Sequence, residues 1–229
     1  MSAHPFAFSP HKPVRVIARV FGAPLAVQGM SWLPVNQLLV WALFAWLPPK
    51  NQRPGQPAGR RLLLSGLKMA VLLGSEWCHN LAHVFAARAA GRPVDAVRIV
   101  AGMPILLYNE PEHPSVSPRQ HLIRSLGGPL INLALLGLSA LIRQRAAPGS
   151  AVREAADAAF GMNAFLSSGS LLPVQVFDGG PVLKWSLVLG GLTPQQAEEA
   201  ARRVNRALGP GLLGAAALAA ARRRWLLAL

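Results

Sequence analysis

The chain has 229 residues, of which 52% are hydrophobic, and its 23 Lys and Arg against nine Asp and Glu give a net charge of +14. Its single cysteine, Cys78, excludes an internal disulfide, and no disulfide partner is expected. The basic residues form short clusters between apolar runs, as in membrane proteins whose cations face lipid headgroups. Trp32, Trp46 and Trp225 stand near the ends of these runs. This pattern favours a multi-pass protein of the cell membrane, surrounded by lipid bilayer, over a nucleic-acid-binding protein or a soluble protein with an apolar core.

The first 28 residues are predicted to be an N-terminal segment that contains a short strand pair. Residues 14–28, VRVIARVFGAPLAVQ, are rich in β-branched residues and are interrupted by Gly22 and Pro24. The apolar run at 31–47 is the first candidate span. It is just long enough, since about 20 residues are needed to cross the hydrocarbon layer.

Three further apolar runs are candidate spans, at 62–90, 122–142 and 155–174. Residues 94–109 are again predicted to form short strands. The fold class is therefore an α-class polytopic membrane protein with about four to six membrane helices, and with short β-strands before the first span and after the second. Residues 29–192 would be its membrane-embedded core.

The last part of the chain, 193–229, is predicted to be a surface helix followed by an apolar helix. Thr193, Pro194 and Gln196 fit a capping box with proline in the first turn. Residues 193–208 are amphipathic and charged. Residues 209–229 are apolar until Arg222, Arg223 and Arg224, and are expected to form a fifth short span or an interfacial helix.

Among the ionisable residues within these apolar runs or beyond their ends, Glu76, His79, His83 and Asp178 stand out. Ionisable groups at membrane depth are costly and point to function. His79 and His83 are four residues apart, so they share one face of a helix and can both reach one ion. Zinc prefers about four ligands, so at least one more protein ligand is needed. Asp178 is the carboxylate far along the sequence that could be this third ligand. The alternative is that the histidines only form hydrogen bonds between helices.

Four stretches of the sequence resemble the site-2 protease family of intramembrane zinc metalloproteases. They are the strand pair and its continuation VRVIARVFGAPLAVQGMSWL; His79 to His83 followed by VFAARAAGRPVDAVRI; GPLIN at 128–132; and LLP at 171–173 followed by FDGG at 177–180. The resemblance implies that His79, His83 and Asp178 bind Zn²⁺. It also implies that Asn132 and Ser170 hold an extended substrate, and that this partner is a membrane-anchored protein cut within or near its span. Water would reach the metal through a polar cavity on the cytoplasmic side.

Two residues depart from the family's pattern. Asn80 occupies the position of the glutamate that acts as the family's base, and Ser170 replaces a common asparagine. An asparagine can hydrogen-bond a water molecule but has no titrating carboxylate to carry its proton. Loss of general acid–base catalysis typically costs about 10²- to 10⁴-fold in rate. We therefore expect a weakly active or inactive pseudoenzyme that binds membrane segments of other proteins.

Glu76 leaves alternatives open, because it shares the helical face of His79 and His83. It could be a fourth ligand, a substitute base, or a protonated residue bonded to a neighbouring helix. One alternative function is thus an active intramembrane metalloprotease that uses Glu76 or zinc-bound hydroxide. Another is a membrane protein that handles metal ions. Because His79 and Asp178 stand late in the second and fourth spans, these spans must run in the same direction for the ligands to meet.

Overall fold

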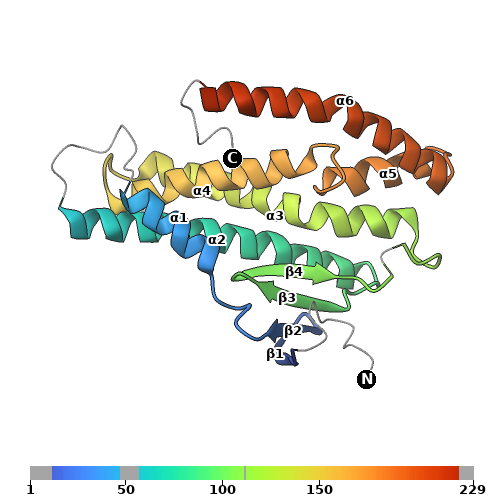
Figure 1. Cartoon of the computed structure of the whole chain (residues 1–229), viewed down its shortest axis with the longest axis horizontal. Coiled ribbons are helices and arrows are strands. Elements are labelled where there is room, and N and C mark those ends of the chain that lie inside the picture. Colours follow the sequence, from blue (N-terminus) through green and yellow to red (C-terminus); the bar gives the residue numbers. More distant parts are fainter. Residues whose placement is uncertain (1–11, 47–56, 111, 222–229) are drawn as a thin grey trace.

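The computed structural model describes residues 12–46, 57–110 and 112–221. It is mostly helical, with one small sheet at the side of the helices (Figure 1). In chain order the elements are β1 (Val14–Val20), β2 (Ala23–Gln28), α1 (Val35–Trp46), α2 (Ala58–Ala89), β3 (Ala96–Val100), β4 (Met103–Leu107), α3 (Pro118–Arg145), α4 (Ala151–Ser168), the 3₁₀ turn η1 (Gly169–Leu171), α5 (Gly179–Leu189) and α6 (Pro194–Ala221).

Both predicted strand pairs are present, and they join into a single four-stranded sheet of order β1-β2-β3-β4. The two hairpins are antiparallel, whereas β2 and β3 pair in parallel at Leu25–Val97 and Ala26–Arg98. This parallel pairing could not be predicted, because α1 and α2 separate the two strands along the chain. Val84 and Ala87 of α2 belong to the buried apolar cluster formed with β2 and β3, which fixes the sheet against the second half of that helix.

Contacts between side chains show how the central helices run. Lys68 pairs with Glu154, and Ser75 contacts Asn163 further along both helices, so α2 and α4 are parallel as expected. Along α3 the order is reversed, since His83 contacts Arg124 and His79 contacts Asn132. α3 is therefore antiparallel to its two neighbours.

The helix bounds correct two of the predicted spans. α1 begins at Val35 rather than at residue 31, and the structure describes it as far as Trp46. α4 ends at Ser168 and gives way to η1, well before residue 174. Among the described residues, one helix, α3, is long and apolar enough to cross a membrane by length and composition. A multi-pass arrangement stays a prediction.

The last helix begins as predicted and ends later than predicted. The Thr193 hydroxyl accepts from the Gln196 backbone N–H at 3.2 Å, and the Gln196 side chain accepts from Thr193 N–H at 2.9 Å, which is a capping box. α6 does not end near residue 209 but continues through Pro210 to Ala221. Arg222, Arg223, Arg224 and Trp225 lie outside the described residues, as do residues 1–11 and 47–56.

Candidate metal centre

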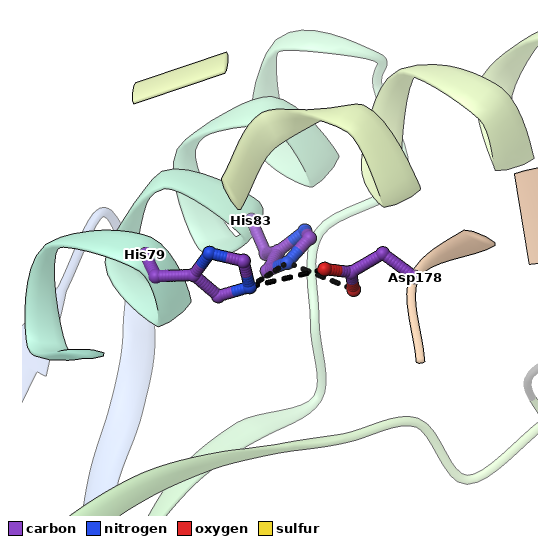
Figure 2. Close-up of side chains that lie close together, drawn as sticks. All are labelled: His79, His83 and Asp178. Carbon is purple, nitrogen blue, oxygen red and sulfur yellow. Dashed lines mark hydrogen bonds and ion pairs between the residues drawn. The ribbon is translucent and has the colours of Figure 1, made fainter. Parts of the chain in front are cut away.

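The two histidines of α2 and the aspartate that precedes α5 point toward one another (Figure 2). His79 and His83 are both 7% exposed, and their Nε2 atoms are 3.1 Å apart. The Asp178 carboxylate oxygens lie 3.1 Å from His79 Nε2 and 3.2 Å from His83 Nε2. Within the described ranges, these three side chains form a group whose donor atoms all lie within 4.8 Å of one another.

Glycines bring the surrounding backbone close to this cluster. A Cβ at Gly179 would lie 2.2 Å from the carbonyl oxygen of Leu171, and one at Gly180 would lie 2.7 Å from that of Val174. Neither distance is tolerable, so only glycine lets the chain after Asp178 pack on the turn that precedes it. Close packing against this turn is therefore what requires glycine at both positions.

The hydrogen bonds of the imidazoles determine which nitrogen faces the cluster. His83 Nδ1 lies 2.6 Å from the backbone oxygen of Arg124, and His79 Nδ1 lies 2.7 Å from Asn132 Oδ1. Oxygen acceptors require a proton on each Nδ1, so each neutral ring presents an Nε2 lone pair. The backbone N–H of Gly128 also approaches His83 Nδ1, but at 3.4 Å it is the weaker contact.

Two nitrogen lone pairs and a carboxylate therefore converge on one point, which is repulsive unless a ring is protonated at Nε2 or a cation lies between the three groups. Tetrahedral zinc with ligand distances of about 2.0–2.2 Å places its ligand atoms about 3.3–3.6 Å apart. The observed separations of 3.1–3.2 Å are slightly shorter than this, and each histidine faces a different oxygen of Asp178, so a small outward shift of the side chains would accommodate the ion. The Nδ1–H groups donate to oxygens, as the outer hydrogen bonds of metal-ligating histidines do. The residues present fit a zinc ion.

A cavity of about 900 Å³ gives access to the cluster, and His79, His83 and Asp178 line it. Four consecutive residues of β4, from Met103 to Leu106, form part of its wall. Because successive side chains of a strand point to opposite faces, this run means that the edge of the strand borders the cavity. β4 is an edge strand of the sheet, so this border carries unpaired backbone groups.

Tyr108 and Arg124 also line the cavity, with the guanidinium 4.2 Å from the centre of the ring. Burial raises the pKa of the Tyr108 phenol, so the group stays neutral and can donate a hydrogen bond.

No protein-family model and no curated protein matches the sequence. The structure is similar to that of a site-2 protease from Methanocaldococcus jannaschii, with a TM-score of 0.56 and 13% sequence identity over 95% of this chain and 89% of that chain. The chain has a site-2-protease-like fold. At this identity the similarity shows the fold alone.

Within the site-2-protease-like fold, Asn80 lines the cavity beside the cluster. Its side-chain N–H₂ donates to the backbone oxygen of Glu76 at 3.0 Å. Glu76 lines the same cavity, but its carboxylate is not within the group of donor atoms that His79, His83 and Asp178 form. This placement is unfavourable for a fourth ligand and leaves a carboxylate in the cavity wall one helical turn away. Cys78 is exposed and likewise stands outside the cluster.

The two residues expected to hold substrate are placed differently from each other. Asn132 is completely buried, and its amide faces His79, Asn163 and the backbone of Ser75. The amide of Asn132 thus contacts His79 in this structure, and a role of Asn132 in holding substrate stays a prediction. Ser170 does line the cavity, but its hydroxyl donates to the backbone oxygen of Leu166 at 2.7 Å.

His121 lines the cavity as well, although it stands in a polar stretch of the sequence. It is 3% exposed and stacks on Trp185, with ring centroids 3.7 Å apart and an interplanar angle of 4°. Arg124 donates to His121 Nδ1 at 3.2 Å, so Nε2 carries the proton. Nε2 has no hydrogen-bond partner among the described residues. The signal in the sequence was spacing: His121, Gly128 and Asn132 recur at seven and four residues, on one face of a helix.

Proposed function

We propose that the protein is a membrane-embedded, zinc-binding homologue of site-2 proteases that binds an extended segment of a membrane-anchored protein and cleaves it slowly or not at all. The observation that carries this proposal is the pairing of a complete ligand cluster with Asn80 at the position beside it. The convergence of His79, His83 and Asp178 supports metal binding, and the amide at position 80 argues against efficient proton transfer.

A bound zinc ion would polarise a peptide carbonyl and lower the pKa of water. A side chain of the protein must still carry a proton from the water to the leaving amine. The Asn80 amide has no titrating group to do this, and its N–H₂ is already bonded to the Glu76 backbone. The expected loss is about 10²- to 10⁴-fold in rate.

The edge of β4 supports binding of an extended segment. A chain in extended conformation can add to an exposed sheet edge through main-chain hydrogen bonds. The run from Met103 to Leu106 would guide such a segment along the cavity, past His79 and Asp178. A membrane helix must unwind locally to pair in this way, which favours segments that contain helix-breaking residues.

The surface of α3 supports a location in the bilayer. Leu130, Leu133 and Leu138 are 59%, 57% and 53% exposed. Only 22% of the most apolar stretch of this helix is buried within the protein. Such a surface on a water-soluble protein would be an aggregation hazard, whereas in lipid it is the expected exterior.

Glu76 supports a second candidate function, an active protease. Its carboxylate lies in the same cavity wall as the cluster, so a shifted base could take the place of Asn80. The two functions differ in whether binding leads to cleavage.

The proposal is tested with the purified protein in detergent and with a single-span reporter whose helix contains a Gly-Pro pair. A photoreactive residue introduced at Ile105, which is 39% exposed on β4, should crosslink to the reporter. The same residue introduced at Leu138, on the lipid-facing side of α3, is the control and should not. Zinc bound without any crosslink from position 105 would overturn the binding function.

A further inference from the structure

A buried chain of polar side chains leads from α2 through α4 and α3 back to His79. Asn163 Nδ2 contacts Ser75 Oγ at 3.2 Å, Asn132 Nδ2 contacts Asn163 Oδ1 at 2.6 Å, and Asn132 Oδ1 contacts His79 Nδ1 at 2.7 Å. Ser75, Asn132 and Asn163 are 6%, 0% and 2% exposed. This series of hydrogen bonds thus begins and ends one turn apart on α2, and it passes through both neighbouring helices.

The direction of these hydrogen bonds is fixed at the α4 end. Oxygen and nitrogen of an amide have the same shape, so their positions must be derived from a partner with only one role. That partner is the backbone oxygen of Ala159, which accepts from the Asn163 side chain at 2.8 Å. The atom of Asn163 that faces it must be nitrogen. Its oxygen then faces Asn132.

The orientation of the Asn163 amide in turn determines the hydrogen bonds beside the metal cluster. Since Asn163 presents an acceptor, Asn132 must present its N–H₂, which also faces the backbone oxygen of Ser75 at 3.5 Å. This leaves the Asn132 oxygen for His79 Nδ1, which must carry the proton of the ring. His79 Nε2 is then left with the lone pair that the cluster needs. A carbonyl of α4 therefore determines the tautomer of a histidine on α2.

We infer that Asn163 is a positioning residue for the metal site, which acts on His79 through Asn132 without touching the metal. The inference rests on the proposed zinc binding by His79, His83 and Asp178. Outer partners of metal-ligating histidines hold the ring and its tautomer, and their loss typically weakens metal affinity about 10- to 100-fold. Asn163 is one step further out, and its effect depends on the polarity that it imposes on Asn132.

The experiment compares zinc affinity in Asn163→Leu, Asn132→Leu and the double variant. Each single variant should weaken zinc binding about 10- to 100-fold. The zinc affinity of the double variant should be no lower than that of Asn132→Leu alone, because both substitutions act on one hydrogen bond. Ser139→Ala is the matched control. Ser139 is also buried on α3, but it donates to Leu136 of its own helix, so zinc affinity should not change. Additive losses in the double variant would overturn the inference.

Nitrogen NMR of the metal-free wild-type protein tests the same inference without a substitution. With ¹⁵N-labelled histidine, His79 should show the tautomer protonated at Nδ1, and Asn163→Leu should shift His79 toward a mixture. A wild-type His79 protonated at Nε2 would contradict it. Wild-type protein that bound no zinc would overturn the metal site and this inference together. Zinc binding that was unchanged in Asn163→Leu would overturn the inference alone.

Discussion

Gly128 of α3 lies directly against the imidazole of His83. A Cβ at this position would be 2.3 Å from His83 Nε2 and 2.6 Å from His79 Nε2. The backbone of α3 therefore forms one wall of the ligand cluster, and the glycine is required by the space that the two rings occupy.

Gly128→Ala should abolish tight zinc binding, because the added methyl group collides with the nitrogens that coordinate the ion. The measurement is zinc content and affinity of the purified variant. Gly137→Ala is a matched control on the same helix, since a Cβ there meets nothing within 4 Å. It should keep zinc and stabilise α3 slightly, by up to about 1 kcal/mol. Normal zinc affinity in Gly128→Ala would show that the ion does not sit between these rings.

Removal of any one ligand should also cause a sharp loss of zinc. We expect about one zinc per chain in the wild type, and much less in His79→Ala, His83→Ala or Asp178→Ala, because two ligands and water do not hold zinc stably. His113→Ala is the control, since this exposed histidine pairs with Glu110 instead. Full zinc content in the triple variant would mean that the cluster is structural.

Glu76→Gln separates the roles left open for that residue. Its carboxylate is outside the cluster, so we expect the variant to keep its zinc. Loss of zinc on this single change would make Glu76 a ligand after all. The readout is the same zinc titration used for the ligand variants, with wild-type protein measured in parallel.

The cluster could be predicted because its signal is local. The spacing of His79 and His83 follows from helix geometry, and Asp178 is marked by its apolar surroundings. Asn163 could not be found in this way, since its role depends on contacts with two other helices. The same holds for the pairing of β2 with β3, which depends on where α2 packs. The predicted first span began too early because its apolar composition does not show where the helix begins.

The parallel course of α2 and α4 gives a topology that labelling can test. Arg60 of α2 contacts Gly149 at 3.3 Å, so the start of α2 and the turn before α4 lie at one end, and the loop before α3 lies at the other. We predict that residues 91–117 face the cytoplasm. In a Cys78→Ser background, Ala147→Cys should be labelled from outside the cell and Pro114→Cys only after the membrane is permeabilised. The reverse pattern would contradict the proposed orientation.

His121→Phe should weaken binding of the membrane segment and leave zinc affinity unchanged. Phenylalanine can keep the stack on Trp185, but it removes the N–H that has no partner among the described residues. One hydrogen bond contributes about 1 kcal/mol, so crosslinking of the reporter through position 105 should require about five-fold more reporter. Undiminished crosslinking would mean that no bound segment uses this group.

Asn80→Glu should create peptidase activity, or strongly raise it, toward a membrane-anchored reporter. Position 80 follows His79 and lines the cavity, so a carboxylate there lies beside the zinc site. A restored proton carrier is expected to increase the rate by about 10²- to 10⁴-fold, which corresponds to roughly 3–5 kcal/mol of barrier. Cleavage is measured by gel analysis of the reporter, with and without a chelator.

Asn80→Gln is the control for this gain, because it has the length of glutamate but no titrating group. It should remain as slow as the wild type, so that any increase in Asn80→Glu is due to the carboxylate. The gain should also depend on His79, His83 and Asp178, since the base has no function without the metal. Zinc-dependent cleavage by the wild type that Glu76→Gln abolishes would instead make Glu76 the base, because its carboxylate lines the same cavity one turn away.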